Sequence, residues 1–346
     1  MLETVRYLIG SVGDSGFGSK STGEEVTAAT PDLRSITAII TAGATSGIGT
    51  ETARVLAMRG ARLVLPTRSL KTADEVKARI VAEIPDAEVI LLPLDLSSLS
   101  SVRCFVSLFL ALHLPLNLLI NNAGRMVYEH AVSEDGVEMT FATNYLGHFL
   151  LTKLLLNKMA ETARETGIQG RIVNVSSHVH SWFSGDCLSY LDRITRKQIP
   201  YDATQAYALS KLANILHTKE LAERLKQMDA NVTANCVHPG VVRTRLNRDR
   251  EGFVTDLVFF LVTKLVKTMP QAAATACYVA THPRLVGISG RYFADCNEAL
   301  PSPLASRPHE AAQLWRASES MTATDLDRTA SGLEPQLASD RPDDEK

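Results

Sequence analysis

The sequence predicts an α/β fold: a doubly wound, mainly parallel sheet with helices on both faces. First, short β-rich runs alternate with helical patterns, as in βαβ units. Second, these runs are apolar almost without interruption, which indicates strands that are covered on both faces. Third, a chain of 346 residues, 45% of them hydrophobic, can bury a generous core, and large α/β folds of this size often stay single domains.

The first half of the chain alternates regularly. A strand is expected at 35–41, where it leads into glycines, and the helix expected at 48–59 has its apolar residues on one face. A strand at 62–65 ended by Pro66, a helix at 72–83 and a strand at 88–92 follow.

The second half continues the same pattern. Strands are expected at 116–120, 171–175 and 231–237, and helices at 137–160 and 204–226. The longest uncharged stretch, Cys104–Ile120, is shorter than a membrane span needs. We interpret it as a helix end, a turn at Pro115 and a buried strand.

Charge and cysteine content exclude several classes of protein. The 36 basic and 38 acidic residues give a formal net charge of −2, so nucleic acid is not expected as a partner. The five cysteines stand far apart in the sequence, so we expect reduced, mostly buried thiols rather than a disulfide framework or a metal site. The N-terminus lacks the basic and apolar regions of a secretory signal.

Both ends of the chain are expected to lie outside a folded domain at 35–316. Residues 1–34 include a stretch rich in Gly and Ser, which suits a flexible arm. Acidic residues in that arm argue against a transit peptide of the usual acid-poor kind. Residues 317–346 lose apolar periodicity and end in a charged run, which favours a polar, disordered tail.

A glycine-rich turn is the first chemical signal. Gly43, Gly47 and Gly49 directly follow the first strand and open the first helix. Glycines permit a tight turn, and the N-terminus of a helix offers free N–H groups to a pyrophosphate. A structural turn could use the same residues, but the position between strand and helix favours a nucleotide site.

The end of the second strand indicates which nucleotide. Sites that prefer NAD usually carry an acidic residue there, which binds the ribose 2′-hydroxyl. Here the segment 65–71 contains no acid, and Arg68 with Lys71 nearby is suited to a 2′-phosphate. The alternative is a solvated surface arginine; the balance favours NADP(H).

Tyr207 and Lys211 form the sharpest chemical pattern. They stand four residues apart in a predicted helix and therefore share a face. A phenol is a poor proton donor and acceptor at neutral pH, and a nearby ammonium favours the phenolate. An ordinary amphipathic helix could carry the same pair, so its weight comes from the combination with the glycine turn.

Seven segments in order carry a resemblance to the classical short-chain dehydrogenase/reductases. They are GATSGIG at 43–49, LDLSS at 94–98, NNAG at 121–124, NYLGHF at 144–149, IVNVSS at 172–177, YALSK at 207–211 and HPGVVRT at 238–244. The resemblance covers about residues 35–300. SKSTGEEV at 19–26 and the LPLNLLINNAG segment make the chain most similar to the plant branch of Tic32-type enzymes, near the retinol dehydrogenases and WW-domain oxidoreductases.

The resemblance implies a Rossmann-like fold with strand order 3-2-1-4-5-6-7, and it implies catalytic roles. Tyr207 is expected to be the general acid/base, and Lys211 to lower its pKa and bind the nicotinamide ribose. Ser177 is expected to orient the carbonyl, with Ser176 as the neighbouring alternative. Asn144 is expected to hold a proton-relay water.

The resemblance also implies a set of positions along the cofactor. Asp95 is expected at the adenine, and the segment from Pro239 to Thr244 beside the nicotinamide. The full set is Gly43, Thr45, Ser46, Gly47, Ile48, Gly49, Arg68, Asp95, Asn122, Ala123, Gly124, Tyr207, Lys211, Pro239, Gly240 and Thr244.

Two features depart from the family pattern. Ala42 stands where the family has Thr before the first loop glycine, and Thr41 comes one residue earlier, as though one residue were inserted. This change is expected to shift the turn or weaken cofactor binding. Thirty positions separate Ser177 from Tyr207, more than in simple members, and the added segment is either a cap on an apolar substrate site or a surface excursion.

Phe253–Met269 is predicted to form an amphipathic helix over the substrate site. Its apolar residues recur at helical spacing: Leu257, Phe260, Leu261 and Leu265. Lys264 and Lys267 would then face anionic headgroups at a membrane surface. A lid or a helix that faces a second subunit is the favoured interpretation, and contact with a membrane surface is the alternative.

Two functions are expected. The first is an NADP(H)-dependent oxidoreductase that acts on a carbonyl or alcohol of an apolar small molecule, and the complete Ser, Tyr and Lys set favours it. The second is an NADP(H)-binding redox sensor or scaffold. By resemblance, that protein would associate with the chloroplast inner envelope, with plastid import components and calmodulin as partners; a cytoplasmic location is the alternative.

Overall fold

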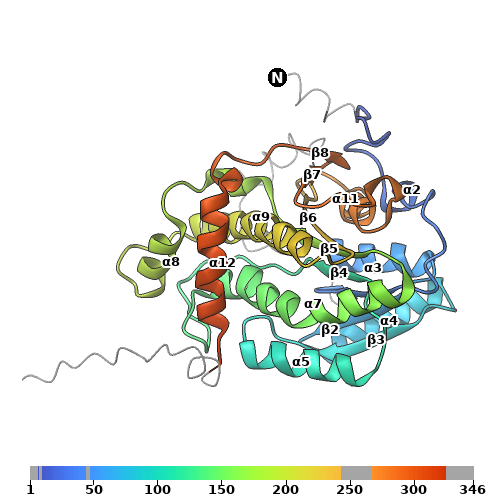
Figure 1. Cartoon of the computed structure of the whole chain (residues 1–346), viewed down its shortest axis with the longest axis horizontal. Coiled ribbons are helices and arrows are strands. Elements are labelled where there is room, and N and C mark those ends of the chain that lie inside the picture. The colour runs from blue at the N-terminus through green and yellow to red at the C-terminus, as the bar shows by residue number, and fades with distance from the viewer. Residues whose placement is uncertain (1–6, 8–9, 44–46, 243–265, 325–346) are drawn as a thin grey trace, which may run out of the picture.

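A single eight-stranded sheet organises the chain (Figure 1). The computed structural model describes residues 7, 10–43, 47–242 and 266–324. The strand order is β3-β2-β1-β4-β5-β6-β7-β8, and all neighbouring strands are parallel except β7 and β8. The strands are β1 (Thr37–Ile40), β2 (Arg62–Thr67), β3 (Val89–Pro93), β4 (Leu118–Asn121), β5 (Gly170–Val175), β6 (Val232–His238), β7 (Tyr292–Ala294) and β8 (Asn297–Glu298). The predicted order is confirmed, and β8 adds an antiparallel edge.

Helices cover both faces of this sheet, as the apolar strands predicted (Figure 1). Side chains alternate along β1, so Ile39 belongs to one core and Ala38 and Ile40 to the other. On the Ile39 side lie α5 (Leu99–Ala111), α7 (Gly147–Thr166), α9 (Ala203–Gln227) and α12 (Pro308–Thr322). On the other side lie α2 (Gly23–Val26), α3 (Ile48–Met58), α4 (Leu70–Glu83) and α11 (Met269–Thr281).

Several boundaries differ from the sequence expectation. Pro66 lies inside β2, which continues to Thr67, because the fixed φ of proline fits an extended chain. The helix expected at 137–160 begins with α6 (Met139–Phe141), passes through a π-helical turn, η1 (Ala142–Leu146), and continues as α7. The segment before α9 forms a 3₁₀ turn, η2 (His178–Trp182), and α8 (Cys187–Thr195).

The stretch Cys104–Ile120 behaves as expected, because α5 ends at Ala111 and β4 begins at Leu118. In the part of the chain that the structure describes, no helix is both long and apolar enough to cross a membrane. All five cysteines are free thiols; Cys104 is exposed and the other four are buried.

Residues 10–34 are packed rather than flexible, which corrects the expected arm. A capping box begins the short helix α2: the Thr22 side chain accepts from the N–H of Glu25, and the Glu25 side chain accepts from the N–H of Thr22. The helix packs against α11. Nearby, the ring of Phe17 meets Tyr278 edge-on. Val26 is fully buried, so apolar contacts hold a segment whose Gly and Ser content suggested mobility.

The expected tail also begins too early. α12 runs to Thr322, and Ser318 and Thr322 are buried on its inner face. The hydroxyls of Tyr145 and Ser318 lie 2.7 Å apart, and Arg103 donates to the carbonyl of Thr322 at 2.5 Å. Residues 317–322 therefore belong to the folded domain; 325–346 lie outside the described residues.

Of the helix predicted at 253–269, the residues described before Met269 are 266–268, and none of them is helical. Residues 253–265 lie outside the described residues. Lys267 is extended and bridges Val242, and α11 begins only at Met269, after the N-cap Thr268. Lys267 is also buried and paired with Asp295 at 2.5 Å, so it does not face a membrane surface.

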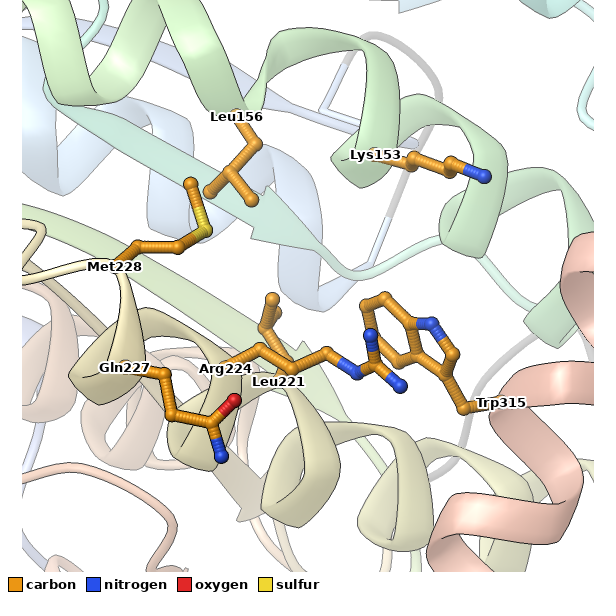
Figure 2. Close-up of a pocket in the computed structure, with 7 residues that line it drawn as sticks. All are labelled: Lys153, Leu156, Leu221, Arg224, Gln227, Met228 and Trp315. Carbon is orange, nitrogen blue, oxygen red and sulfur yellow. The ribbon is translucent and has the colours of Figure 1, made fainter.

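A groove of about 300 Å³ lies between α7, α9 and α12 (Figure 2). The guanidinium of Arg224 lies over the Trp315 ring, with its central carbon 4.3 Å from the ring centre. The other lining residues are Lys153, Leu156, Leu221, Gln227 and Met228. None of the predicted site residues lines this groove.

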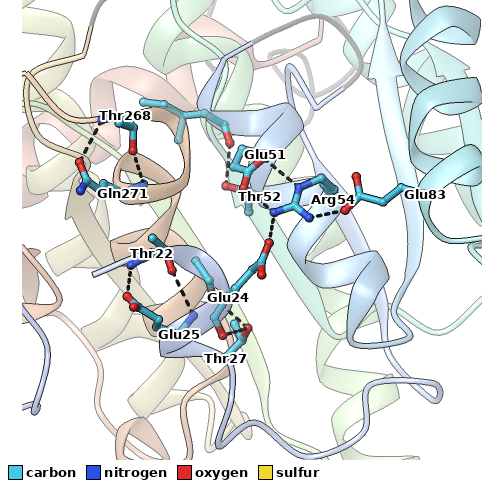
Figure 3. Close-up of polar contacts among 12 residues, drawn as sticks. Thr22, Glu24, Glu25, Thr27, Glu51, Thr52, Arg54, Glu83, Thr268 and Gln271 are labelled. Atoms are coloured by element: carbon cyan, nitrogen blue, oxygen red, sulfur yellow. Dashed lines mark hydrogen bonds and ion pairs between the residues drawn. The ribbon is translucent and has the colours of Figure 1, made fainter. Parts of the chain in front are cut away.

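Arg54 joins three helices through three carboxylates (Figure 3). Its side chain is 18% exposed, and it contacts Glu24 of α2 at 2.5 Å, Glu51 of α3 at 2.8 Å and Glu83 of α4 at 2.6 Å. Hydrogen bonds to Glu51, together with those to Glu24 and Glu83, hold the pKa of Arg54 above its usual value against the effect of burial.

We expect Arg54→Met to lower the free energy of unfolding by about 1–3 kcal/mol, because it leaves three close carboxylates without their shared cation. Urea unfolding measures this loss. Arg34→Met is the control: its pair with Asp32 is solvent-exposed, so this variant should unfold at nearly the same urea concentration as wild type. Equal losses in the two variants would show that the Arg54 cluster is no more than a surface ion pair.

Candidate active site

The carboxyl ends of β1, β4, β5 and β6 meet at one edge of the sheet, because these strands are parallel. Most of the predicted site residues follow these strand ends or stand on α9, which packs against β5, β6 and η2; Arg68 follows β2, Asp95 follows β3 and Asn144 lies in η1. Thr45, Ser46 and Thr244 lie outside the described residues.

Thr41 organises the turn after β1. Its Oγ1 accepts hydrogen bonds from the N–H groups of Asn122 (2.8 Å) and Ala123 (2.9 Å), which follow β4. The adjacent Ala42 adopts a left-handed backbone, with φ of 58°. The left-handed backbone of Ala42 thus lies at the position of the extra residue. The hydroxyl of Thr41 joins the turn after β1 to the turn after β4.

His148 completes this arrangement, and sequence reasoning missed it. Its Nδ1 lies 3.0 Å from the carbonyl of Asn144, which can only accept, so Nδ1 carries the proton. Nε2 is then the acceptor, and the Thr41 hydroxyl donates to it at 2.9 Å. Burial lowers the pKa of His148 to about 4, which keeps the ring neutral. Its position in the NYLGHF segment, one turn after Asn144, was the available signal.

The glycine turn leaves room that a larger residue would fill. A Cβ on Gly49 would lie 2.5 Å from Nδ2 of Asn122 and 2.9 Å from the carbonyl oxygen of Ala42. Gly47, the N-cap of α3, has φ of 83°, and no atom of the described residues lies within 4 Å of a Cβ placed there. Ile48 is the first residue of α3. A close turn beside an open helix N-terminus fits the pyrophosphate of a dinucleotide.

Charged groups gather where the adenosine is expected. Burial opposes ionisation of Asp95, but hydrogen bonds from the hydroxyl and amide of Ser97, with the charges of Arg68 and Arg125, hold its pKa below the usual value. Arg68 follows β2 directly and is exposed. Arg125 was not among the sequence candidates; its place right after the NNAG segment was the signal.

Asn144 lies in the π-helical turn η1 and is fully buried. Its Oδ1 accepts from the N–H of Arg125 at 2.8 Å, and its Nδ2 donates to the carbonyl of Arg125 at 2.9 Å and to Oγ of Ser210 at 3.0 Å. The hydroxyl of Ser210 donates to the carbonyl of Tyr207. The amide of Asn144 thus ties the chain after β4 to α9.

Tyr207 and Lys211 share a face of α9, as their spacing predicts. Nζ of Lys211 lies 5.6 Å from the centre of the Tyr207 ring and donates to the carbonyl of Val175 at 3.0 Å. A Cβ on Gly124 would lie 3.3 Å from the same Nζ, so the glycine leaves room beside the ammonium.

Burial dominates the acid–base balance of this pair. It raises the pKa of Tyr207 to about 12 and lowers that of Lys211 to about 8. The expected lowering of the Tyr207 pKa by Lys211 is therefore not what this structure displays. At neutral pH, Tyr207 is a neutral phenol that can donate a proton.

The two neighbouring serines differ in what they contact. Ser176 is buried, and its Oγ donates to the carbonyl of Lys211 at 2.7 Å. Ser177 is half-buried, and its Oγ accepts from the N–H of Val179 at 3.4 Å, which leaves its proton available. This difference favours Ser177 over Ser176 as the residue that meets a substrate.

Beyond β6, the backbone at Gly240 is tightly enclosed. Gly240 has φ of 96°, and a Cβ there would lie 2.6 Å from Cδ of Lys267. The N–H of Lys267 donates to the carbonyl of Val241. Pro239 is buried beside this turn. Lys267, which is buried and paired with the half-buried Asp295, therefore packs against the segment expected near the nicotinamide.

Comparison with known proteins gives the family. Residues 37–184 match the family model for short chain dehydrogenases. The chain is 48% identical over 316 residues to short-chain dehydrogenase TIC 32 B, chloroplastic, of Brassica napus, which covers 91% of this chain and 97% of that protein. The chain belongs to the short-chain dehydrogenase/reductase family.

Other members of the family are similar over most of the chain. Retinol dehydrogenase 12 of Bos taurus is 39% identical, over 81% of this chain and 84% of that protein. WW domain-containing oxidoreductase of Homo sapiens is also 39% identical, over 81% and 67% of the two proteins. A crystal structure from Mycobacterium paratuberculosis superposes with a TM-score of 0.67 at 29% identity, over 86% and 96% of the two chains. As a short-chain dehydrogenase/reductase, the protein is an oxidoreductase of a family that acts on CH–OH groups with nicotinamide cofactors.

Proposed function

We propose that this short-chain dehydrogenase/reductase uses NADP(H) and acts on a carbonyl or alcohol of an apolar small molecule. The observation that supports the proposal is that Asn144, Ser177, Tyr207 and Lys211 stand on elements that pack against one another. They come from the π-helical turn, the end of β5 and α9, and α9 packs against η2 and η1. The glycine turn after β1 fits the dinucleotide at the same edge of the sheet.

In this mechanism a bound nicotinamide supplies or accepts the hydride at the carbonyl carbon. Tyr207, protonated at neutral pH, donates its phenolic proton to the carbonyl oxygen as that oxygen gains charge; in the reverse direction the phenolate accepts the alcohol proton. The hydroxyl of Ser177 donates a hydrogen bond to the same oxygen and orients it. The ammonium of Lys211 would contact the nicotinamide ribose and stabilise the phenolate, and Asn144 would hold the relay water.

Cofactor choice follows from Arg68 at the end of β2. Its guanidinium can form two charge-assisted hydrogen bonds to a 2′-phosphate, and an Asp would repel that phosphate and accept from the 2′-hydroxyl of NAD. We expect Arg68→Asp to lower the ratio of kcat/KM for NADPH over NADH by about ten- to a hundredfold, equivalent to about 1.5–3 kcal/mol.

The comparison is made on both cofactors with wild type, Arg68→Asp and Arg68→Lys. The Lys variant keeps a cation and is the control, so it should retain most of the preference for NADPH. An unchanged ratio in the Asp variant would contradict the assignment of Arg68 to the 2′-phosphate. Lys71 lies close in sequence and could leave the switch incomplete.

A second candidate, an NADP(H)-binding redox sensor or scaffold in the plastid, is favoured by the similarity to a chloroplastic TIC 32 protein. A screen of apolar aldehydes and ketones, read out as consumption of NADPH, separates the two. Turnover supports the enzyme. Tight NADPH binding without turnover, together with capture of import components from isolated plastids, supports the sensor.

A further inference from the structure

A buried histidine holds the residue that we propose to orient the substrate. The backbone hydrogen bonds between β5 and β6 continue as far as Ser176, whose N–H donates to the carbonyl of Val237 at 2.8 Å. The carbonyl of the next residue, Ser177, accepts from two donors of His180: its backbone N–H at 3.1 Å and its ring Nδ1 at 2.7 Å. His180 therefore fixes the backbone of Ser177 at the point where the chain leaves the sheet.

The other side of the same ring contacts a distant segment. Nε2 of His180 lies 3.0 Å from the backbone nitrogen of Ser302, which comes between β8 and the turn η6 (Leu304–Ser306). That N–H can only donate, so Nε2 accepts. The proton of the neutral imidazole must then sit on Nδ1, where it is donated to the carbonyl of Ser177.

We propose that His180 is a positioning residue for Ser177, in which a neutral imidazole braces the Ser177 carbonyl against the backbone of Ser302. The inference rests on the proposed function, because it assigns Ser177 to the substrate oxygen. It adds a residue outside the Asn, Ser, Tyr and Lys set: the contact to Ser302 fixes the tautomer of the ring, and the hydrogen bond from Nδ1 to the Ser177 carbonyl does the positioning.

The surroundings suit this role. His180 is only 2% exposed, and the ring of Tyr292 packs edge-on against it at 5.4 Å between centres. The other titratable rings near it are His178, 6.4 Å away, and His238, which packs on His178. Burial lowers the pKa of His180, so the neutral form with one donor and one acceptor persists at neutral pH.

Three variants separate positioning from simple packing. His180→Phe keeps a buried ring and removes both polar contacts; we expect kcat to fall about ten- to a hundredfold, since small misplacements of reacting groups cost that much, while the KM for NADPH changes less than about twofold. His180→Asn retains a donor where Nδ1 stands and should recover most of kcat. His178→Ala is the control, because that side chain is exposed and its ring lies beside His180 and His238, whereas the hydrogen bonds to His238 and from Ser181 are made by the His178 backbone.

Each outcome decides the proposal. Loss of kcat in the folded Phe variant, with rescue by Asn, supports it; wild-type kcat in the Phe variant overturns it. If the Phe variant melts near the assay temperature, the Asn variant decides alone: kcat within about threefold of wild type supports the brace, and the loss expected for Phe overturns it.

A second measurement does not depend on activity. Nitrogen-15 NMR of histidine-labelled wild-type protein should display neutral rings with the proton on Nδ1 for both His148 and His180, and only the His180 signal should vanish in His180→Asn. An Nε2–H tautomer for the His180 ring would overturn the brace. If the tautomer is as expected but wild type turns over no carbonyl compound, the proposed function fails while the contact geometry stands.

Discussion

Tyr207→Phe should fold, bind NADPH as wild type does and lose nearly all turnover. The ring is half-buried on α9, and phenylalanine preserves its packing while removing the proton donor. General acid–base catalysis by a positioned side chain is typically worth about 10²–10⁴-fold, and we expect kcat to fall by that amount. Because burial holds the Tyr207 phenol protonated, the loss should appear across the neutral pH range in the reductive direction.

The measurement is kcat for carbonyl reduction beside the Kd of NADPH from fluorescence titration. Tyr201→Phe is a suitable control, because its hydroxyl lies 2.9 Å from both the carbonyl oxygen of Val127 and Oε1 of Glu138, either of which can accept its proton, and none of the four proposed catalytic residues is among these partners. Tyr201→Phe should lower the free energy of unfolding and leave kcat nearly unchanged. A Tyr207→Phe enzyme with wild-type kcat would remove Tyr207 from the mechanism.

Lys211→Met should lose both turnover and cofactor affinity, because one ammonium is proposed to serve the phenol and the nicotinamide ribose. Methionine fills a similar volume in a site that is only 3% exposed, but it donates nothing to the carbonyl of Val175. We expect NADPH to bind about ten- to a hundredfold more weakly, the usual range for a lost charge-assisted hydrogen bond. Loss of turnover with unchanged NADPH binding would refute the contact to the ribose.

The same lysine predicts a pH dependence. Burial lowers the pKa of Lys211 to about 8, so the ammonium is present below pH 8 and is lost as the pH rises through that value. Turnover of wild type should therefore decline above about pH 8. Lys211→Arg, whose guanidinium stays charged, should delay that decline if it is active, and Lys153→Met, on the exposed face of α7, should leave the profile unchanged.

The sequence alone determined the features that depend on neighbours along the chain. The alternation of apolar strands and helices predicted the parallel sheet and the two covered faces. A separation of four residues on a helix was enough to bring Tyr207 and Lys211 together, because one helical turn fixes that relation. The glycine turn was legible for the same reason, since a strand, three glycines and a helix follow each other directly.

Only the tertiary structure decided contacts between segments that are distant in sequence. Ser302 reaches His180 across 122 positions, and the hydroxyl of Thr41 meets His148 across 107, so periodicity could not predict either pair. Composition likewise misled at both ends of the domain, because the apolar groups of residues 10–34 and of α12 are few but well placed against existing helices. Local patterns specify helices and strands through short-range geometry, whereas these contacts depend on how loops return the chain to the sheet.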